Sequence, residues 1–386
     1  MLKKTYSPKD AMSDQQYMKP EILHNEDLEE ISKEYVDNPR YVAPTSGLET
    51  AATNKPYPVH GAPKFYNILN RTRHAFREYL AEFIGTLILV MFGDGVVAQV
   101  TLSDGKSGNY TTIAMTWATA VFLGYEASAG ISGGHLNPAV TLSAVVFRGF
   151  PLKKLPGYVA AQWLGGFCGA LIVYGTYYQS FNDFEGGTQR TVIGDTATAG
   201  IFCTFPQPFL STKGQVTSEV VSTALLQFGI FSMTDPCNSS LGPAFPFGLW
   251  ILIFGIGAGF GYQTGYAINL ARDFAPRVAA AVVGYPSEMF TAYHHYFWVP
   301  LCCPLFGALF GAFLYDVFVY QGDDSPLNQA DWGLDQFKKN FKDWDLRPDF
   351  GTSQIARMER IRDQTKYEEE AYKQAAAAGQ TSGSPV

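Results

Sequence analysis

Residues 132–139 read Ser-Gly-Gly-His-Leu-Asn-Pro-Ala, and residues 264–271 read Thr-Gly-Tyr-Ala-Ile-Asn-Leu-Ala. A short apolar segment accompanies each stretch, at 138–148 and at 270–283. Both segments are too short to cross a bilayer as helices, because that takes about 20 residues. Irregular backbone next to a short helix is tolerated at membrane depth only where it is buried in protein or lines a water-filled cavity. The two stretches therefore predict a pair of half-helices beside a pore.

The charge distribution of the chain indicates a membrane protein. Residues 79–318 carry only 20 Asp, Glu, Lys or Arg side chains in 240 positions, whereas the two flanks carry the remaining 43. In soluble domains about a quarter of the residues are charged. We therefore expect an all-α integral membrane protein in contact with the lipid bilayer. The net charge of −7 comes with no basic stripe, which argues against nucleic acid as a partner.

Six apolar stretches have the composition of membrane-spanning helices. They lie at roughly 79–100, 111–130, 156–178, 219–234, 246–266 and 297–319. Cytoplasmic loops are enriched in Lys and Arg. Three such residues precede the first span and three follow the second, namely Arg71, Arg73, Arg77, Arg148, Lys153 and Lys154. Both termini are therefore expected in the cytosol of a multi-pass protein, for which we expect the plasma membrane, and the sequon at Asn109 is expected to face outside.

An internal repeat relates the two halves of this region. Glu82 opens the first span and precedes Asn137 by 55 residues, while Glu219 opens the fourth span and precedes Asn269 by 50 residues. Each half contains three spans, which is an odd number, so the second half enters the membrane from the opposite side. The sequence therefore predicts an inverted repeat in which the two half-helices meet near the midplane.

The chain from about residue 76 to 320 resembles the major intrinsic protein family of aquaporins and glycerol facilitators, through its doubled Asn-Pro-Ala-type motif and the Glu that opens each half. The resemblance implies an aquaporin-like fold with six transmembrane helices and two re-entrant half-helices, assembled as a homotetramer. It implies halves at about 76–180 and 215–320 joined by a long extracellular loop. Cytosolic tails follow at 1–75, which we expect to be mostly disordered, and at 321–386, where cytosolic regulators are a possible partner.

The half-helix starts favour a channel for uncharged solutes. A helix start has unsatisfied N–H groups and a partial positive charge, which repels cations and hydronium. The motif residues are Asn137, Pro138, Ala139, Asn269, Leu270 and Ala271. An Asn before a helix is by itself a plain N-cap, but two at matched positions of a repeat indicate amide donors in a pore. Backbone carbonyl acceptors are expected from Gly133, Gly134, His135, Gln263, Thr264, Gly265 and Tyr266.

Two kinds of ionisable side chain near these loops allow more than one interpretation. Glu82 and Glu219 lie at membrane depth, and the resemblance favours a role in holding the carbonyl-bearing loops over one in proton transport. We interpret His135 as a packing histidine beside the pore, with a pH-sensing role as the alternative.

Alignment on the two Asn residues places four residues at the positions that form the selectivity filter in the family: Trp117, Gly257, Tyr266 and Arg272. Water-selective members have a His where Gly257 stands. A Gly with two aromatic rings leaves room for the carbon backbone of glycerol, and Asp273 after Arg272 resembles the signature of glycerol facilitators. We therefore predict a passive channel for glycerol and small polyols, with some water. The alternatives are a mainly water-conducting aquaporin and an ion-coupled secondary transporter.

Three residues depart from the pattern of the family. Leu270 replaces the second Pro, as in some fungal glycerol channels, and Tyr266 replaces a Phe. Asp94 stands near the outer end of the first span, where the family is usually apolar, and we expect it to form an interface or vestibule hydrogen bond. The spans contain no set of residues typical of an enzyme, and the spacing of the five Cys matches no metal site. We therefore expect no enzyme activity, no cofactor and no metal.

Overall fold

The computed structural model describes residues 67–322, 325–334 and 338. The predictions for the N-terminal tail up to residue 66 and for the C-terminal tail from residue 339 lie outside the described residues. Within the tail predicted to be mostly disordered, Ile68–Ala75 form helix α2. Its N-cap is Asn67, whose side chain accepts a hydrogen bond from the backbone N–H of Asn70 at 2.8 Å.

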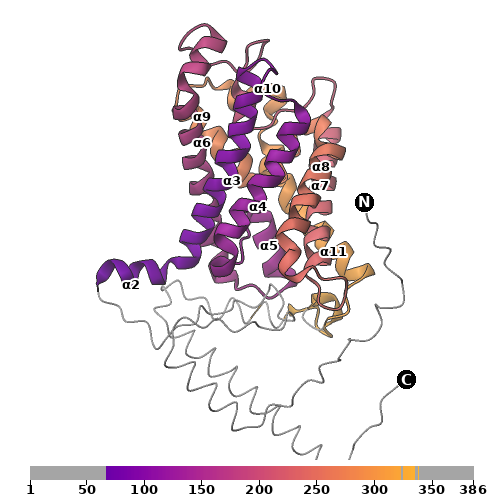
Figure 1. Ribbon diagram of the computed structural model, residues 1–386. Coiled ribbons are helices and arrows are strands. Elements are labelled where there is room, and N and C mark those ends of the chain that lie inside the picture. Colours follow the sequence, from indigo (N-terminus) through magenta and orange to yellow (C-terminus); the bar gives the residue numbers. More distant parts are fainter. Residues whose placement is uncertain (1–66, 323–324, 335–337, 339–386) are drawn as a thin grey trace, which may run out of the picture. The chain divides into compact units, whose positions relative to one another are not determined.

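Six long helices make up most of the described chain, and each predicted span corresponds to one of them (Figure 1). They are α3 (Arg77–Leu102), α4 (Tyr110–Ser132), α6 (Leu155–Glu185), α7 (Thr212–Thr234), α8 (Phe245–Thr264) and α11 (Trp298–Phe318). Five of them are long and apolar enough to cross a membrane. The sixth, α4, has the length but a lower hydropathy, because it is rich in Thr, Ser and Gly and contains Glu126.

Two helices are longer than the apolar stretches predicted from the sequence. Polar residues continue α6 at its C-terminal end and begin α7 at its N-terminal end. Helix α6 runs to Glu185 and ends at Gly186, whose φ of 72° is the left-handed conformation that favours glycine at a helix end. Helix α7 starts at Thr212, where the side chain of Ser211 caps it by accepting from the N–H of Gly214. Apolar content alone marks only the part of a helix that faces lipid or the core.

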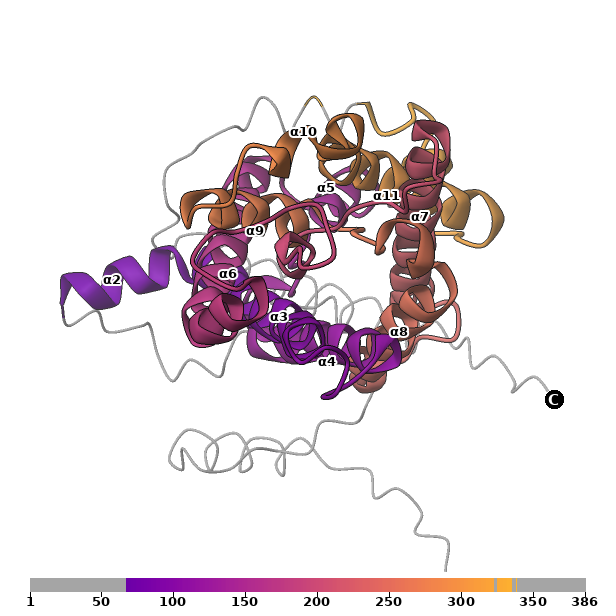
Figure 2. The ribbon, with the colours of Figure 1, turned by 90° about the horizontal axis from the view of Figure 1, so that it is seen from above.

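The two predicted half-helices are α5 (Pro138–Phe147) and α9 (Leu270–Val282). Helix α9 packs against α6 of the first half, and α5 packs against α11 of the second half. Each half thus places its half-helix against a long helix of the other half. In the view from above, α5 and α9 lie among the long helices (Figure 2).

Glycines bring the long helices into close contact at equivalent places in the two halves. A Cβ on Gly165 of α6 would meet the carbonyl oxygen of Phe83 on α3, and a Cβ on Gly307 of α11 would lie 2.6 Å from the carbonyl oxygen of Val220 on α7. Phe83 and Val220 each follow the Glu that opens their half. Small residues permit this backbone approach in membrane helix bundles, and its repetition agrees with the predicted internal repeat.

Several short elements in the loops were not predicted. They are the helix α10 (Glu288–His295) and the 3₁₀ turns η1 (Leu152–Lys154), η2 (Ala199–Ile201), η3 (Gly242–Ala244) and η4 (Pro326–Asn328). Helix α10 is interrupted, since Tyr293 and His294 have positive φ angles. These segments are too short for a periodic hydrophobic pattern to reveal them.

Candidate functional site

The candidate site is a cavity of about 300 Å³ that is lined by residues of both halves. The loops before the two half-helices contribute to its wall, as does Arg148, which follows α5. Most of the remaining wall is apolar and comes from α7 and α8, including Leu226, Ile230, Phe245, Leu249 and Ile253. The cavity therefore has polar groups along its loops and an apolar face on the opposing helices.

Asn137 and Asn269 join the starts of the two half-helices. The Asn137 Nδ2 donates to the carbonyl of Ile268 at 2.8 Å, and the Asn269 Nδ2 donates to the carbonyl of Leu136 at 2.8 Å. The Oδ1 of each Asn accepts the N–H of the second residue of its own half-helix at 2.9 Å. A carboxamide nitrogen has two N–H groups, and both Asn side chains border the cavity. One N–H of each Asn therefore remains for a solute.

The other motif residues are buried at the first two positions of each half-helix. Pro138 and Ala139 begin α5, and Leu270 and Ala271 begin α9. None of the four borders the cavity. Their positions indicate that they shape the helix starts rather than contact a solute.

Glu82 holds the first loop in place. Its carboxylate accepts the backbone N–H of His135 at 2.9 Å and that of Leu136 at 2.7 Å. It also accepts from the Ser132 hydroxyl at 2.6 Å and from the Gln162 amide at 2.8 Å. These bonds fix a strained backbone, since Leu136 has a φ of 53°. Gly133, Gly134 and His135, which were predicted to offer carbonyls, border the cavity.

Glu219 holds the second loop in the same way. It accepts the backbone N–H of Ala267 and that of Ile268, both at 3.0 Å. Tyr266 and Ile268 have φ angles of 40° and 44°, so this loop also alternates through the left-handed region. Gln263, Thr264 and Gly265 do not border the cavity. The carbonyl of Gln263 instead accepts the backbone N–H of Gln207 at 2.9 Å.

Three of the four predicted filter residues meet at the cavity wall: Trp117, Tyr266 and Arg272. The Arg272 guanidinium carbon lies 4.0 Å from the centre of the Trp117 ring, which is a cation–π contact. The fourth, Gly257, does not border the cavity because the ring of Tyr266 covers it. A Cβ on Gly257 would lie 2.9 Å from both Cζ and the hydroxyl oxygen of Tyr266.

Tyr110 contacts Gly257 behind the predicted filter and was not predicted. Its hydroxyl donates to the carbonyl of Gly257 at 2.9 Å, although the two residues are 147 positions apart. The Tyr266 hydroxyl has no hydrogen-bond partner among the described residues. The Tyr that replaces a Phe thus places a polar atom beside Gly257, where the sequence predicted free space.

Asp273 does not border the cavity and instead fixes the loop between α6 and α7. It accepts from both the backbone N–H and the hydroxyl of Thr204 at 2.7 Å. It also pairs with the buried guanidinium of Arg277 at 3.0 Å. Arg277 donates further to the carbonyls of Thr204 and Met289. Arg277 was not predicted, although an Asp and an Arg four residues apart on a helix are a recognisable pair.

His135 packs between aromatic rings, with its ring centre 4.9 Å from that of Phe150 and 5.3 Å from that of Tyr158. Its Nδ1 lies 3.1 Å from the hydroxyl of Thr141. This surrounding matches the packing interpretation of His135 made from the sequence.

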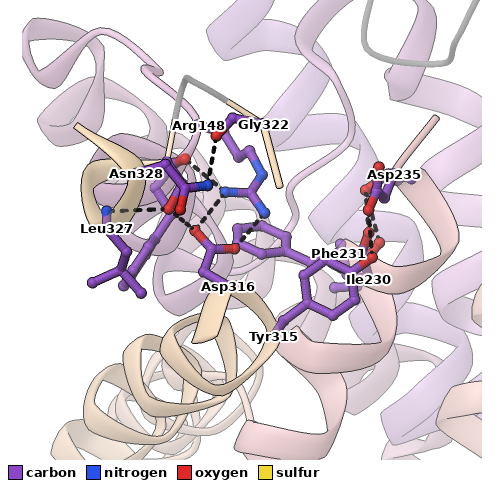
Figure 3. Close-up of polar contacts among 12 residues, drawn as sticks. Arg148, Ile230, Phe231, Asp235, Tyr315, Asp316, Gly322, Leu327 and Asn328 are labelled. Carbon is purple, nitrogen blue, oxygen red and sulfur yellow. Dashed lines mark hydrogen bonds and ion pairs between the residues drawn. The ribbon is translucent and has the colours of Figure 1, made fainter. Parts of the chain in front are cut away.

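Arg148 at the cavity wall is held by residues that the sequence did not single out (Figure 3). Its guanidinium binds both carboxylate oxygens of Asp316, at 2.7 Å and 3.0 Å. Its carbon lies 3.9 Å and 4.0 Å from the ring centres of Phe231 and Tyr320. The Ser325 hydroxyl donates to Asp316 at 2.5 Å. The segment after α11 is thereby attached next to the cavity.

No group of three His, Cys, Asp or Glu side chains that could hold a metal ion occurs in the described ranges. The polar groups of the cavity are amides, carbonyls, hydroxyls, the imidazole of His135 and the guanidinium groups of Arg148 and Arg272. These groups can form hydrogen bonds with a neutral solute.

Comparisons with known proteins agree with this geometry. Residues 70–315 match the family model of the major intrinsic protein. The chain is 51% identical to "Probable aquaglyceroporin-2" of Gibberella zeae over 69% of this chain and 79% of that one. It is also 37% identical to the "Glycerol uptake/efflux facilitator protein" of Saccharomyces cerevisiae. That match covers 76% of this chain and 50% of the other protein.

A solved structure shares the fold. It is the X-ray structure of the aquaglyceroporin from Plasmodium falciparum, with a TM-score of 0.57 and 31% sequence identity over 64% of this chain and 97% of that one. The chain therefore belongs to the major intrinsic protein family, whose members are membrane channels and not enzymes.

Proposed function

We propose that the protein is a passive channel for glycerol and other small uncharged solutes, which also passes some water and excludes protons and ions. The observation that carries the proposal is the pair of half-helix starts joined through Asn137 and Asn269 at a cavity with a mostly apolar wall. Glycerol has hydroxyls along one edge and C–H groups along the other, so it matches a wall with one polar and one apolar side. The names of the relatives from Gibberella zeae and Saccharomyces cerevisiae point to the same class of solute.

The site residues have distinct roles in this proposal. The free N–H groups of Asn137 and Asn269, together with the guanidinium of Arg272, donate to solute hydroxyls. The loop carbonyls accept from them, and Glu82 and Glu219 keep the loops in position. Trp117 and Tyr266 provide the apolar side of the filter. The two positive helix ends and Arg272 repel cations.

One observation favours a second candidate, a mainly water-conducting channel. The Tyr266 ring occupies the space that the absence of a side chain at Gly257 would leave open. A narrower filter discriminates against glycerol more than against water. We rank this candidate second, because Arg272 stacks on Trp117 and both residues still form an amphipathic wall.

An ion-coupled transporter is less well supported by the contacts of its candidate carboxylates. Coupling through Glu82 or Glu219 would require that carboxylate to bind the ion, but the carboxylate oxygens of both accept backbone N–H groups. The two carboxylates are thus already used in holding the loops.

We further propose that the protein is a homotetramer in the plasma membrane with both termini in the cytosol, as the positive loops and the family resemblance indicate. Large apolar side chains on the outside of the helices, such as Phe92, Ile251 and Phe306, are exposed and suit contact with lipid or with neighbouring subunits. The tails remain candidates for binding cytosolic regulators.

The test is uptake of labelled glycerol into liposomes that contain the purified protein. We expect uptake to stop at the external concentration and to be the same with and without proton and sodium gradients. Accumulation above the external concentration under an ion gradient would contradict the channel.

A further inference from the structure

Arg148 borders the cavity at the end opposite to the filter. It contacts Phe231 on the last turn of α7, from which a short loop leads to the start of α8. Tyr266 of the filter instead follows the C-terminal end of α8, and the 20 residues of that helix span about 30 Å. The cavity therefore has an arginine near each end, Arg272 at the filter and Arg148 at the other end.

Contacts on several sides hold the guanidinium of Arg148. Its carbon atom lies 3.9 Å from the ring centre of Phe231 and 4.0 Å from that of Tyr320. The carboxylate of Asp316 accepts from Nη2 at 2.7 Å and from Nη1 at 3.0 Å (Figure 3). Nη1 also donates to the carbonyl of Phe147 at 2.7 Å. Two parallel N–H···O bonds fix the orientation of an arginine as well as its position.

Asp316 is the buried member of this ion pair. Its side chain is completely buried, whereas 21% of the Arg148 side chain is exposed. The carboxylate of Asp316 also accepts from the hydroxyl of the buried Ser325 at 2.5 Å. Asp94 differs from it, because its carboxylate has no partner among the described residues, and the hydrogen bond expected from the sequence is not formed within them.

The position of the Arg148 side chain depends on these partners. A guanidinium on a long side chain stays where its charge is solvated or paired, and a charge that loses its buried partner is costly to leave in place. The wall near Arg148 contains apolar side chains such as Ile230 and Phe245. The cavity itself is therefore the adjacent space in which water can solvate the guanidinium.

We propose that Asp316 is a positioning residue that holds the Arg148 guanidinium against the wall and thereby keeps this end of the pore open. When Asp316 loses its charge, Arg148 turns into the cavity, where it obstructs the path of the solute. Ser325 supports the same position through its bond to Asp316, so the segment after α11 contributes to the pore. The proposal rests on the proposed channel function and concerns the end of the pore that lies away from the filter.

The test is a double-mutant cycle on glycerol and water permeability, both measured in liposomes that contain the purified full-length protein. Asp316→Asn keeps the shape of the side chain and removes its charge, and we expect it to lower both permeabilities several-fold. In the background of Arg148→Leu the same substitution should cause no further loss, because the obstructing side chain is absent. A merely structural role of Asp316 would give the same loss in both backgrounds.

Ser325→Ala is the milder variant and decides the question if Asp316→Asn does not fold. It removes one hydrogen bond to Asp316 and leaves the ion pair with Arg148 in place. We expect a smaller loss of both permeabilities than in Asp316→Asn, and none in the background of Arg148→Leu. No loss in either background, or an equal loss in both, would overturn the proposal.

Glu185→Gln is the matched control. Glu185 pairs with Arg190 at 3.0 Å, its side chain is as buried as that of Asp316, and neither member of the pair borders the cavity. The substitution should leave both permeabilities nearly unchanged. The proposal is overturned if folded Asp316→Asn keeps wild-type permeability, or if Glu185→Gln gives the same loss. Absence of glycerol flux in the wild-type protein would overturn the proposed function alone, because water permeability still reports on the position of Arg148.

Discussion

Asn137 and Asn269 have nearly the same backbone conformation, with φ and ψ of −150° and 119° in the first and −155° and 112° in the second. Pro138 follows the first, whereas Leu270 follows the second. Extended torsions of this kind are those that a residue before proline prefers. The second half-helix therefore starts with a geometry suited to proline, although the sequence has leucine there.

The substitution Leu270→Pro should be tolerated. Leu270 is the first residue of α9, and the side chain of Asn269 accepts from Ala271 and Arg272 rather than from Leu270. Proline at this position loses no intrahelical bond. Proline also lowers the conformational entropy of the unfolded chain. We therefore expect the free energy of unfolding to rise by about 0.4–1 kcal/mol. Glycerol flux should stay within a few-fold, as measured together with thermal unfolding in detergent.

Ala271→Pro is the control for this substitution. The N–H of Ala271 donates to Asn269 at 2.9 Å, so a proline there removes the shorter of the two cap hydrogen bonds of α9 and should lower the unfolding temperature. A stable Leu270→Pro protein with changed solute selectivity would contradict our account and would mean that Leu270 sets the width of the pore.

Gly257→Ala should reduce glycerol flux more than water flux. The added Cβ would lie 2.9 Å from Tyr266 and 3.3 Å from the Cβ of Ala114, so the tyrosine ring must move toward the cavity. One extra carbon in a fitted pocket changes discrimination by about tenfold or more. Gly255→Ala is the control, because a Cβ there meets no atom within 4 Å. Equal loss of glycerol flux in both variants would mean that the loss does not come from a change at the filter.

Glu82→Leu should prevent assembly of the folded channel. The substitution leaves the backbone N–H groups of His135 and Leu136 and the amide of Gln162 without their acceptor. A buried group that loses its partner costs about 1–3 kcal/mol, so the sum is comparable with the stability of a typical domain. Size-exclusion chromatography and thermal unfolding would measure the loss. A Glu82→Leu channel with wild-type stability would show that the loop is held by other contacts.

Thiol labelling should determine the side of the membrane on which the α7–α8 loop lies. Cys237 in that loop is exposed, whereas Cys203 in the α6–α7 loop is buried. Burial raises the pKa of the Cys203 thiol to about 12, and the reactive form is the thiolate. At pH 8 an impermeant maleimide should therefore label Cys237 and not Cys203. With both termini in the cytosol, labelling of intact cells should require permeabilisation.

Cys237→Ser should abolish that labelling, which identifies the reacting residue. Labelling of Cys237 in sealed cells would reverse the proposed orientation.

The fold could be predicted from local patterns in the sequence. The spans follow from apolar stretches, and the half-helices follow from the doubled motif around Asn137 and Asn269. The matched places of Glu82 and Glu219 in the repeat, together with the resemblance to the family, favoured a role for both in supporting the loops. These features are repeated or continuous along the chain, so they are visible without the structure.

The contacts that complete the site depend on residues far apart in the chain. Arg148 and Asp316 are 168 positions apart, and Tyr110 and Gly257 are 147 apart. Neither pair has a local pattern that joins its members. For the same reason the sequence predicted open space at Gly257, since only the folded chain brings the Tyr266 ring against it.

We expect glycerol to pass through the cavity and the filter of Trp117, Tyr266 and Arg272. Stopped-flow light scattering tests this expectation directly, with liposomes that contain the protein exposed to a glycerol gradient and, separately, to an impermeant osmolyte. We predict rapid re-swelling in glycerol, far faster than in empty liposomes, together with measurable water permeability. Fast water movement with glycerol re-swelling no faster than in empty liposomes would rule out a glycerol channel and would identify a water channel.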